Sequence, residues 1–379
     1  MSKRKILVQI VTFAFLLLSF AVTSAFAHEV RVRIMQDAAS LILTIKGAYK
    51  IEDAAAQKVL SQGKNLHATV TIEKNNILIG NTRFSSSKIY IRPADADSIT
   101  INGRKFKGGI ELLKKDKASF SVINFIDLEE YIKGVLFHES SHYWPAEALK
   151  AQAIVCRSFA LFQMQENTKS DYDVTSDIYS QMYGGSTSER YRTNRAVEET
   201  REQVITYRGK IFPAYYHATC AGSTEDASAL WNTDIPPLKG VACGFCKGSP
   251  HYRWHLVLPE NTLREKLAQS GYKFKKINAV TSAHKDASGR ITELTISGGE
   301  KSLKLSGKDF RSSLGPNLIK SLQFEVSAAG CDFVFEGLGW GHGVGFCQWG
   351  AYFMAKEGRS CREILAYYYP GAAVAVRVQ

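Results

Sequence analysis

Residues 124–160 read NFIDLEEYIKGVLFHESSHYWPAEALKAQAIVCRSFA and contain two helix signals separated by a short polar segment. Asp127 is a favourable N-cap residue, and Glu130 completes a capping-box pattern ahead of apolar residues at helical spacing. Pro145 suits the start of a second helix, whose apolar residues recur at core-facing positions as far as Met164. The stretch predicts a helix over 128–138 and another from 145, with Glu139 between them.

Short alternating apolar and polar runs fill residues 28 to about 120, and strand patterns return from about residue 204. Helical patterns interrupt the second region near 260–270 and 307–314. Strands mixed with isolated helices, rather than regular βα alternation, predict an α+β fold. We expect a mixed sheet and helices around a groove in a domain over 101–379. A smaller β-rich module over 28–100, which serves as a scaffold or docking domain, would precede it.

The N-terminus has the features of a secretory signal peptide over residues 1–27. Three positive residues precede an apolar run from Ile6 to Val22, and Ala25-Phe26-Ala27 forms a small-x-small cleavage pattern. An uncleaved membrane anchor is the alternative, because the run is near the minimum length for a span. We expect an exported protein, in the periplasm or at the wall-facing side of the cytoplasmic membrane.

The formal net charge of the chain is +12, and residues 1–27 contribute three positive charges and no negative one, which leaves +9 for a mature chain. A basic surface suits an anionic partner, such as a wall polymer or lipid headgroups. Export argues against nucleic acid as a partner.

Glu139 follows the apolar residues Val135-Leu136-Phe137 and precedes Tyr143-Trp144. Desolvation beside such residues favours the neutral form of a carboxyl group, which a general acid needs near neutral pH. The alternative without a catalytic role is an ordinary solvated glutamate at a helix end. A third interpretation is the HExxH string of zinc peptidases, formed by His138, Glu139 and His142, with Glu166 as a candidate third ligand. Pro145 opposes it, because the required helix would stop soon after His142.

Several motifs in order resemble the stage II sporulation protein D (SpoIID/LytB) family over roughly residues 100–372. Besides residues 124–160, they are SQMYGG at 180–185, YHATCAGST at 216–224, SPHYRW at 249–254, GWGHGVGFCQWGA at 339–351 and YYPG at 368–371. The chain departs from the family at His138-Glu139-Ser140-Ser141, where Ser-Glu-Met-Pro is usual, and at Phe346-Cys347, where Met-Ser is usual.

The resemblance implies a lytic transglycosylase that cleaves between N-acetylmuramic acid and N-acetylglucosamine in peptidoglycan strands stripped of peptides. The family's catalytic glutamate falls on Glu139. A non-catalytic wall-binding or amidase-enhancing module is the alternative within the family, and cell-wall amidases or other wall-remodelling proteins are candidate partners. The resemblance places the substrate-binding residues among the matching motifs, at Trp144, Arg157, Gln181, Tyr183, His342, Gln348 and Trp349.

Four potential metal ligands occur as His217-x-x-Cys220 and Cys243-x-x-Cys246. A set of three cysteines and one histidine predicts a tetrahedral Zn²⁺ site, and four protein ligands leave no position for water, so the role would be structural. Export leaves a disulfide open instead, for example from Cys220 to Cys243 or Cys246.

Glycines alternate with other residues from Gly337 to Gly345. On a strand they would form one bare face, which a sugar chain or another backbone can approach closely. His342 and Gln348, near Trp340 and Trp349, favour a saccharide groove that the resemblance places opposite Glu139.

Overall fold

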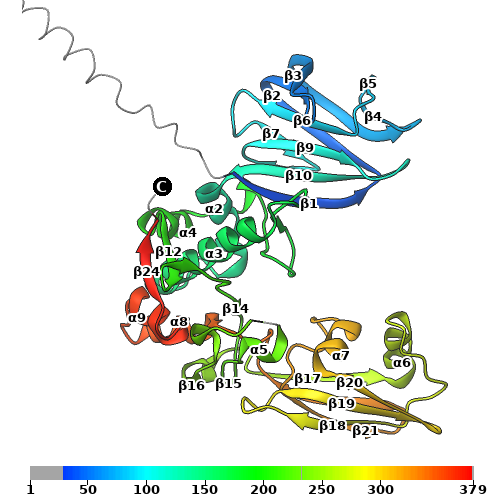
Figure 1. Ribbon diagram of the computed structural model, residues 1–379, viewed down its shortest axis with the longest axis vertical. Coiled ribbons are helices and arrows are strands. Elements are labelled where there is room, and N and C mark those ends of the chain that lie inside the picture. The colour runs from blue at the N-terminus through cyan, green and yellow to red at the C-terminus, as the bar shows by residue number, and fades with distance from the viewer. Residues whose placement is uncertain (1–28, 232, 378–379) are drawn as a thin grey trace, which may run out of the picture.

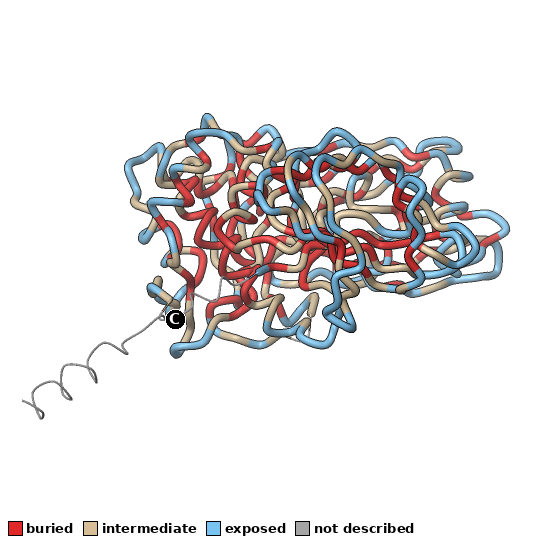
Figure 2. The backbone as a smooth tube through the Cα atoms, turned by 90° about the horizontal axis from the view of Figure 1, so that it is seen from above, coloured by how far each residue is buried: buried red, intermediate tan, exposed pale blue. Residues whose placement is uncertain are grey.

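The computed structural model describes residues 29–231 and 233–377. The expected signal peptide at 1–27 lies outside the described residues. Within them, no helix is both long enough and apolar enough to cross a bilayer. Buried apolar side chains of this part of the chain form three clusters. The buried segments run through the interior, and the exposed ones lie mainly at the outer loops (Figure 2).

The first cluster lies under a large, mostly antiparallel sheet with the path β11-β1-β10-β9-β6-β2-β3-β4-β5, to which β7 and β8 add beside β2. Its strands are β1 (Glu29–Ala38), β2 (Ser40–Asp53), β3 (Lys58–Glu73), β4 (Asn76–Ile79), β5 (Thr82–Phe84), β6 (Lys88–Pro93), β7 (Ile99–Ile101), β8 (Arg104–Phe106), β9 (Gly109–Lys114), β10 (Phe120–Asp127) and β11 (Val174–Thr175). The sheet crosses the expected boundary at residue 100, since β1 pairs with β10.

Two helices follow directly from β10, as predicted: α2 (Leu128–Glu139) and α3 (Ala146–Glu166). The Asp127 side chain accepts hydrogen bonds from the backbone N–H groups of Glu129 and Glu130, so the predicted N-cap is confirmed. Both helices pack into the first cluster, and the other face of α3 belongs to the second. Helix α3 therefore connects the sheet to the rest of the molecule.

The second cluster gathers chain from two distant regions around α3. Elements η1 (Ser186–Ser188) and α4 (Tyr191–Glu199) contact α2, and the buried residues Ala196 and Val197 of α4 belong to the first cluster. The first region of the second cluster contains β12 (Gln203–Tyr207), β13 (Lys210–Ile211), β14 (Tyr216–His217), β15 (Gly222–Ser223), α5 (Ala227–Leu230), η2 (Pro236–Leu238), β16 (Ala242–Cys243) and η3 (Phe245–Gly248). The C-terminal region contains β23 (Phe346–Cys347), α8 (Gln348–Lys356), α9 (Cys361–Tyr368) and β24 (Ala373–Val376). Strand β14 pairs with β23, which joins the two regions.

The third cluster belongs to residues 253–338, which we call the 253–338 unit. It contains the sheets β17-β22-β21 and β18-β19-β20, with two helices. The elements are β17 (Arg253–Pro259), α6 (Glu260–Gln269), β18 (Ala279–Lys285), β19 (Ile291–Gly298), β20 (Lys301–Ser306), α7 (Gly307–Leu314), β21 (Phe324–Ala329) and β22 (Asp332–Leu338). The helices confirm the predictions near 260–270 and 307–314. This unit and the large sheet lie at opposite ends of the molecule (Figure 1), and the α+β prediction is confirmed.

Candidate functional site

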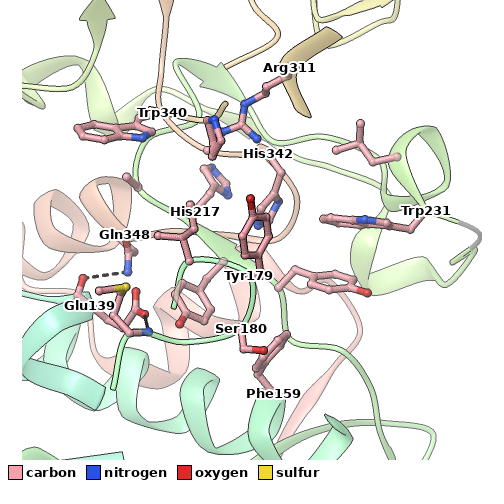
Figure 3. Close-up of a pocket in the computed structure, with 18 of the residues that line it drawn as sticks. Glu139, Phe159, Tyr179, Ser180, His217, Trp231, Arg311, Trp340, His342 and Gln348 are labelled. Carbon is pink, nitrogen blue, oxygen red and sulfur yellow. Dashed lines mark hydrogen bonds between the residues drawn. The ribbon is translucent and has the colours of Figure 1, made fainter. Parts of the chain in front are cut away.

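A cleft of about 620 Å³ lies between the α2–α3 region and the 253–338 unit. One wall contains Glu139 at the end of α2 and residues of α3, and the opposite wall contains residues of α7 and of the segment after it. Aromatic side chains line much of the space between them, namely Phe159, Tyr179, Tyr215, Tyr216, Trp231 and Trp340 (Figure 3). An apolar cleft with a few polar groups is typical of a small-molecule or saccharide site.

Glu139 is half-buried and lines this cleft. Burial raises the pKa of its carboxyl group, and hydrogen bonds from the Met182 amide, Tyr216 and Gln348 oppose that rise. The Met182 N–H donates to Oε1 at 2.9 Å, and Gln348 Nε2 donates to the Glu139 main-chain carbonyl at 2.9 Å (Figure 3). These contacts fix the end of α2, while the raised pKa favours the protonated carboxyl that a general acid needs.

A buried chain of polar side chains supports the Tyr216 hydroxyl beside Glu139. Gln181 Nε2 contacts the Tyr216 hydroxyl at 3.4 Å, and the Tyr131 hydroxyl donates to Gln181 Oε1 at 3.1 Å. Gln181 is fully buried and does not line the cleft, so it acts on the site through Tyr216 rather than on a ligand directly.

Of the expected substrate residues, His342 and Gln348 line the cleft. Burial holds the pKa of His342 well below its usual value, so the ring is neutral. Its Nδ1 accepts from the Val344 N–H at 3.1 Å, and its ring lies 5.0 Å from the Trp231 ring. His342 therefore braces the aromatic wall.

The other expected substrate residues, Trp144, Trp349, Tyr183 and Arg157, do not line the cleft. Trp144, Tyr183 and Arg157 are buried, and Trp349 is partly buried. The rings of Trp144 and Trp349 lie 5.1 Å apart, and the Tyr183 hydroxyl donates to Asn124 Oδ1. These residues hold the elements that carry the site.

Arg157 is fully buried and forms a bidentate ion pair with Glu129. Its Nε and Nη2 donate to the two carboxylate oxygens at 2.8 and 2.7 Å, which ties α3 to α2. Removing one partner of such a pair leaves a buried charge uncompensated.

We therefore expect Arg157→Met to lower the free energy of unfolding by about 3–5 kcal/mol, measured by urea denaturation. Arg201→Met is the control, because Arg201 is half exposed and pairs with Glu198 at 3.3 Å. It should cost no more than about 1 kcal/mol. If Arg157→Met has normal stability but does not bind glycan strands, Arg157 is a substrate-binding residue after all.

The HExxH string does not form the helical zinc site that it suggests. Helix α2 ends at Glu139 and Ser140 is extended, so His142 lies beyond the helix. His138 Nε2 lies 2.6 Å from Ser188 Oγ. No described histidine belongs to a group of three or more potential metal ligands.

Four buried thiols come together, among them Cys243 of β16 and Cys347 of β23: Cys220, Cys243, Cys246 and Cys347. Their sulfur atoms all lie within 4.8 Å of one another, close to the ~3.8 Å sulfur separation of a tetrahedral Zn²⁺ thiolate site. The backbone N–H groups of Cys220 and Gly350 donate to Cys347 Sγ, as suits a thiolate. This donor set fits zinc, and we call it the thiol cluster.

Cys347 takes the fourth position that the sequence assigned to His217. His217 Nδ1 lies 3.1 Å from the Val344 carbonyl, and its ring faces the cleft. Burial lowers the pKa of His217 to about 3, so the ring is neutral. Its Nε2 is buried without a partner among the described residues, which leaves a hydrogen-bond acceptor in the cleft wall.

Comparison with known proteins identifies the family. The family model described as stage II sporulation protein matches residues 116–207, and a domain of unknown function (DUF8618) matches residues 244–345. The stage II sporulation protein D of Bacillus subtilis is 30% identical over 302 residues, which cover 74% of this chain and 85% of that protein. The chain belongs to the stage II sporulation protein D family.

Two further relatives extend the comparison. An uncharacterized protein of Brachyspira hyodysenteriae is 32% identical over 92% of this chain and 94% of its own length. The Bacillus subtilis protein named amidase enhancer is 26% identical over 86% of this chain and 52% of its own length. The expected resemblance to the stage II sporulation protein D family is thus confirmed along most of the chain.

The glycine-rich segment after Leu338 is a loop, so the predicted strand is wrong there. Strand β22 ends at Leu338, and Gly341 and Gly345 have φ values of +115° and +71°. A Cβ on Gly345 would lie 2.2 Å from the Tyr215 carbonyl oxygen, and one on Gly341 would lie 2.6 Å from His217 Cβ. The glycines allow close approach of the protein's own backbone, which brings Gly341 and His342 to the cleft.

Sequence reasoning missed Tyr216, the Met182 amide and Arg311. Tyr216 stands in the YHATCAGST motif next to His217, so its position in the motif was an available signal. Arg311 lies outside the motifs, and only the folding of the 253–338 unit against the cleft reveals it.

Proposed function

We propose that this protein cleaves peptidoglycan glycan strands as a lytic transglycosylase, with Glu139 as the general acid and base. Membership of the stage II sporulation protein D family supports a cell-wall-related role. The observation that carries the finer proposal is the carboxyl group of Glu139, whose pKa is raised by burial in an aromatic-lined cleft. Among the described residues that line the cleft, no other side chain is a carboxylate.

One carboxyl group is sufficient for this reaction. Protonated Glu139 donates its proton to the glycosidic oxygen as the bond from that oxygen to the muramyl C1 breaks. The resulting carboxylate accepts the proton of the muramyl C6 hydroxyl, whose oxygen bonds to C1 and closes a 1,6-anhydro ring. The proton returns to Glu139 and no water is consumed, whereas glycoside hydrolysis generally uses two carboxylates.

Burial raises the pKa of Glu139 most, and the Tyr216 hydroxyl opposes that rise because it stabilises the charged form. We expect Tyr216→Phe to raise the pKa of Glu139. The protonated acid then persists to higher pH, and the alkaline limb of the kcat/KM profile moves upward. The measurement is strand cleavage across pH. Tyr215→Phe is the control, since hydrogen bonding to Thr233, not to Glu139, affects the Tyr215 hydroxyl. A downward shift in Tyr216→Phe, or equal shifts in both variants, would contradict this assignment.

The experiment that tests the function follows the chain length of peptide-free glycan strands by size-exclusion chromatography. The proposal expects the wild-type protein to shorten strands and to leave isolated wall peptides intact. His138→Ala should change the rate only modestly, since His138 contacts Ser188 and does not line the cleft. Cleaved peptides, with activity abolished in His138→Ala, would instead support a zinc peptidase.

A non-catalytic wall-binding or amidase-enhancing module is the second candidate, and the likeness to the Bacillus subtilis amidase enhancer favours it. This candidate predicts that the protein binds glycan strands without shortening them. It also predicts that a wall amidase releases strands from the wall faster when this protein is present than when it is absent. Both candidates place the protein outside the cytoplasm, as the signal sequence suggests, where peptidoglycan and wall-remodelling proteins are its partners.

The thiol cluster would hold a structural Zn²⁺ through Cys220, Cys243, Cys246 and Cys347. Four sulfur ligands complete a tetrahedral shell, so the metal would link chain segments rather than activate water. Cys347 directly precedes Gln348, which holds the end of α2 at Glu139. We infer that the cluster keeps the floor of the cleft in place.

A further inference from the structure

The charged side chains that line the cleft are distributed unevenly between its walls. Glu139 lies on the α2 side, and Lys308 and Arg311 come from α7 of the 253–338 unit. Arg311 lies across the cleft from Glu139 (Figure 3). One side is therefore acidic or neutral, and the other is cationic.

Arg311 is a partly buried cation without a protein counter-ion. Its Nε and Nη2 donate to the main-chain carbonyls of Ile319 and Lys320, at 2.9 and 3.2 Å. No ion pair joins it to a carboxylate of the described residues, and burial alone lowers its pKa to about 10. By contrast, the buried Arg157 and Arg290 each have a glutamate partner. Three N–H groups of Arg311 are left for a ligand.

The neighbouring cation, Lys308, is exposed. Lys308 Nζ donates to the main-chain carbonyl of Leu230 at 3.0 Å, and it too has no carboxylate partner among the described residues. Trp340, which lines the cleft, carries Lys320 Nζ 4.8 Å from its ring centre. A desolvated guanidinium beside a second cation and an aromatic surface suits a carboxylate carried on a sugar.

We propose that Arg311, assisted by Lys308, binds the free lactyl carboxylate of a muramyl residue at a subsite across the cleft from Glu139. The identity of this ligand rests on the proposed function, because muramyl residues are the acidic sugars of peptidoglycan strands. A carboxylate can accept two parallel hydrogen bonds from the free edge of the guanidinium. In a peptide-bearing strand the same carboxyl group is an amide without charge, so this subsite selects strands from which peptides have been removed.

The test measures binding rather than cleavage, in the Glu139→Gln background, by isothermal titration with peptide-free strands. Adding Arg311→Gln should weaken binding by about 10- to 100-fold. The same strands with their lactyl carboxyl groups converted to primary amides should bind both proteins with equal, weakened affinity. Lys304→Gln is the matched control, because Lys304 is an exposed cation of the same unit and pairs with Glu293.

Each outcome has a distinct meaning. If Glu139→Gln binds no strand, both the proposed function and the subsite fail. If it binds strands and Arg311→Gln changes nothing, the subsite alone fails. If Arg311→Gln weakens the binding of amidated or peptide-bearing strands as much as the binding of peptide-free strands, Arg311 does not recognise the lactyl carboxylate. Because Arg311 also holds the segment after α7, Arg311→Lys is the fold control, and it should keep the melting temperature and part of the affinity.

Discussion

Glu139→Gln should reduce strand cleavage by at least about 10²–10⁴-fold, the contribution typical of general acid–base catalysis. Glutamine keeps the size of the side chain and an oxygen that can accept the Met182 N–H. It has no proton to donate to the glycosidic oxygen, and its amide does not accept one from the C6 hydroxyl. Initial rates on peptide-free strands give the effect, and strand binding and thermal stability should stay near their wild-type values.

Glu166→Gln is the matched control for this result. Glu166 is exposed at the end of α3 and is the residue that a zinc-peptidase interpretation needs as a third ligand. Its replacement should leave cleavage unchanged. If Glu139→Gln cleaves strands at a rate within a few-fold of the wild type, Glu139 is not the general acid.

The second large effect is expected at the thiol cluster. The purified protein should contain about one Zn²⁺ per chain, and Cys347→Ala should lose it with a marked fall in melting temperature. Structural zinc contributes on the order of 10 kcal/mol to the folding of small zinc domains, and this loss is comparable to the whole stability of a domain. Metal analysis by mass spectrometry and thermal unfolding provide the two measurements.

His217→Ala distinguishes the two ligand sets in the same experiment. Because its Nδ1 contacts the Val344 carbonyl and its ring lies outside the cluster, this variant should retain zinc. Loss of zinc in His217→Ala with retention in Cys347→Ala would restore the set expected from sequence. A metal-free protein whose peptide map joins Cys220 to Cys243 or Cys246 would establish the disulfide alternative.

Local signals in the sequence predicted four helices of the described residues, α2, α3, α6 and α7, but not α4, α5, α8 or α9. Asp127 and Pro145 mark the starts of α2 and α3, and the patterns near 260–270 and 307–314 match α6 and α7. Caps and periodic apolar residues act within a few turns, so these elements can be read without knowledge of the fold.

Long-range contacts explain what the sequence did not reveal. Cys347 joins Cys220 across 127 residues through the pairing of β14 with β23, which no local spacing encodes. Its signal was the departure from the family's usual serine, which sequence reasoning left unassigned. Arg157 was placed among the substrate residues because it stands in a matching motif, but motif membership does not separate residues that support a site from residues that line it.

The most direct test of the central claim is mass spectrometry of the ends produced from peptide-free glycan strands by the wild-type protein and by Glu139→Gln. The account predicts 1,6-anhydromuramyl ends, lighter than ordinary reducing ends by one water, from the wild type alone. Ordinary reducing ends from the wild type, or anhydro ends from both proteins, would contradict it.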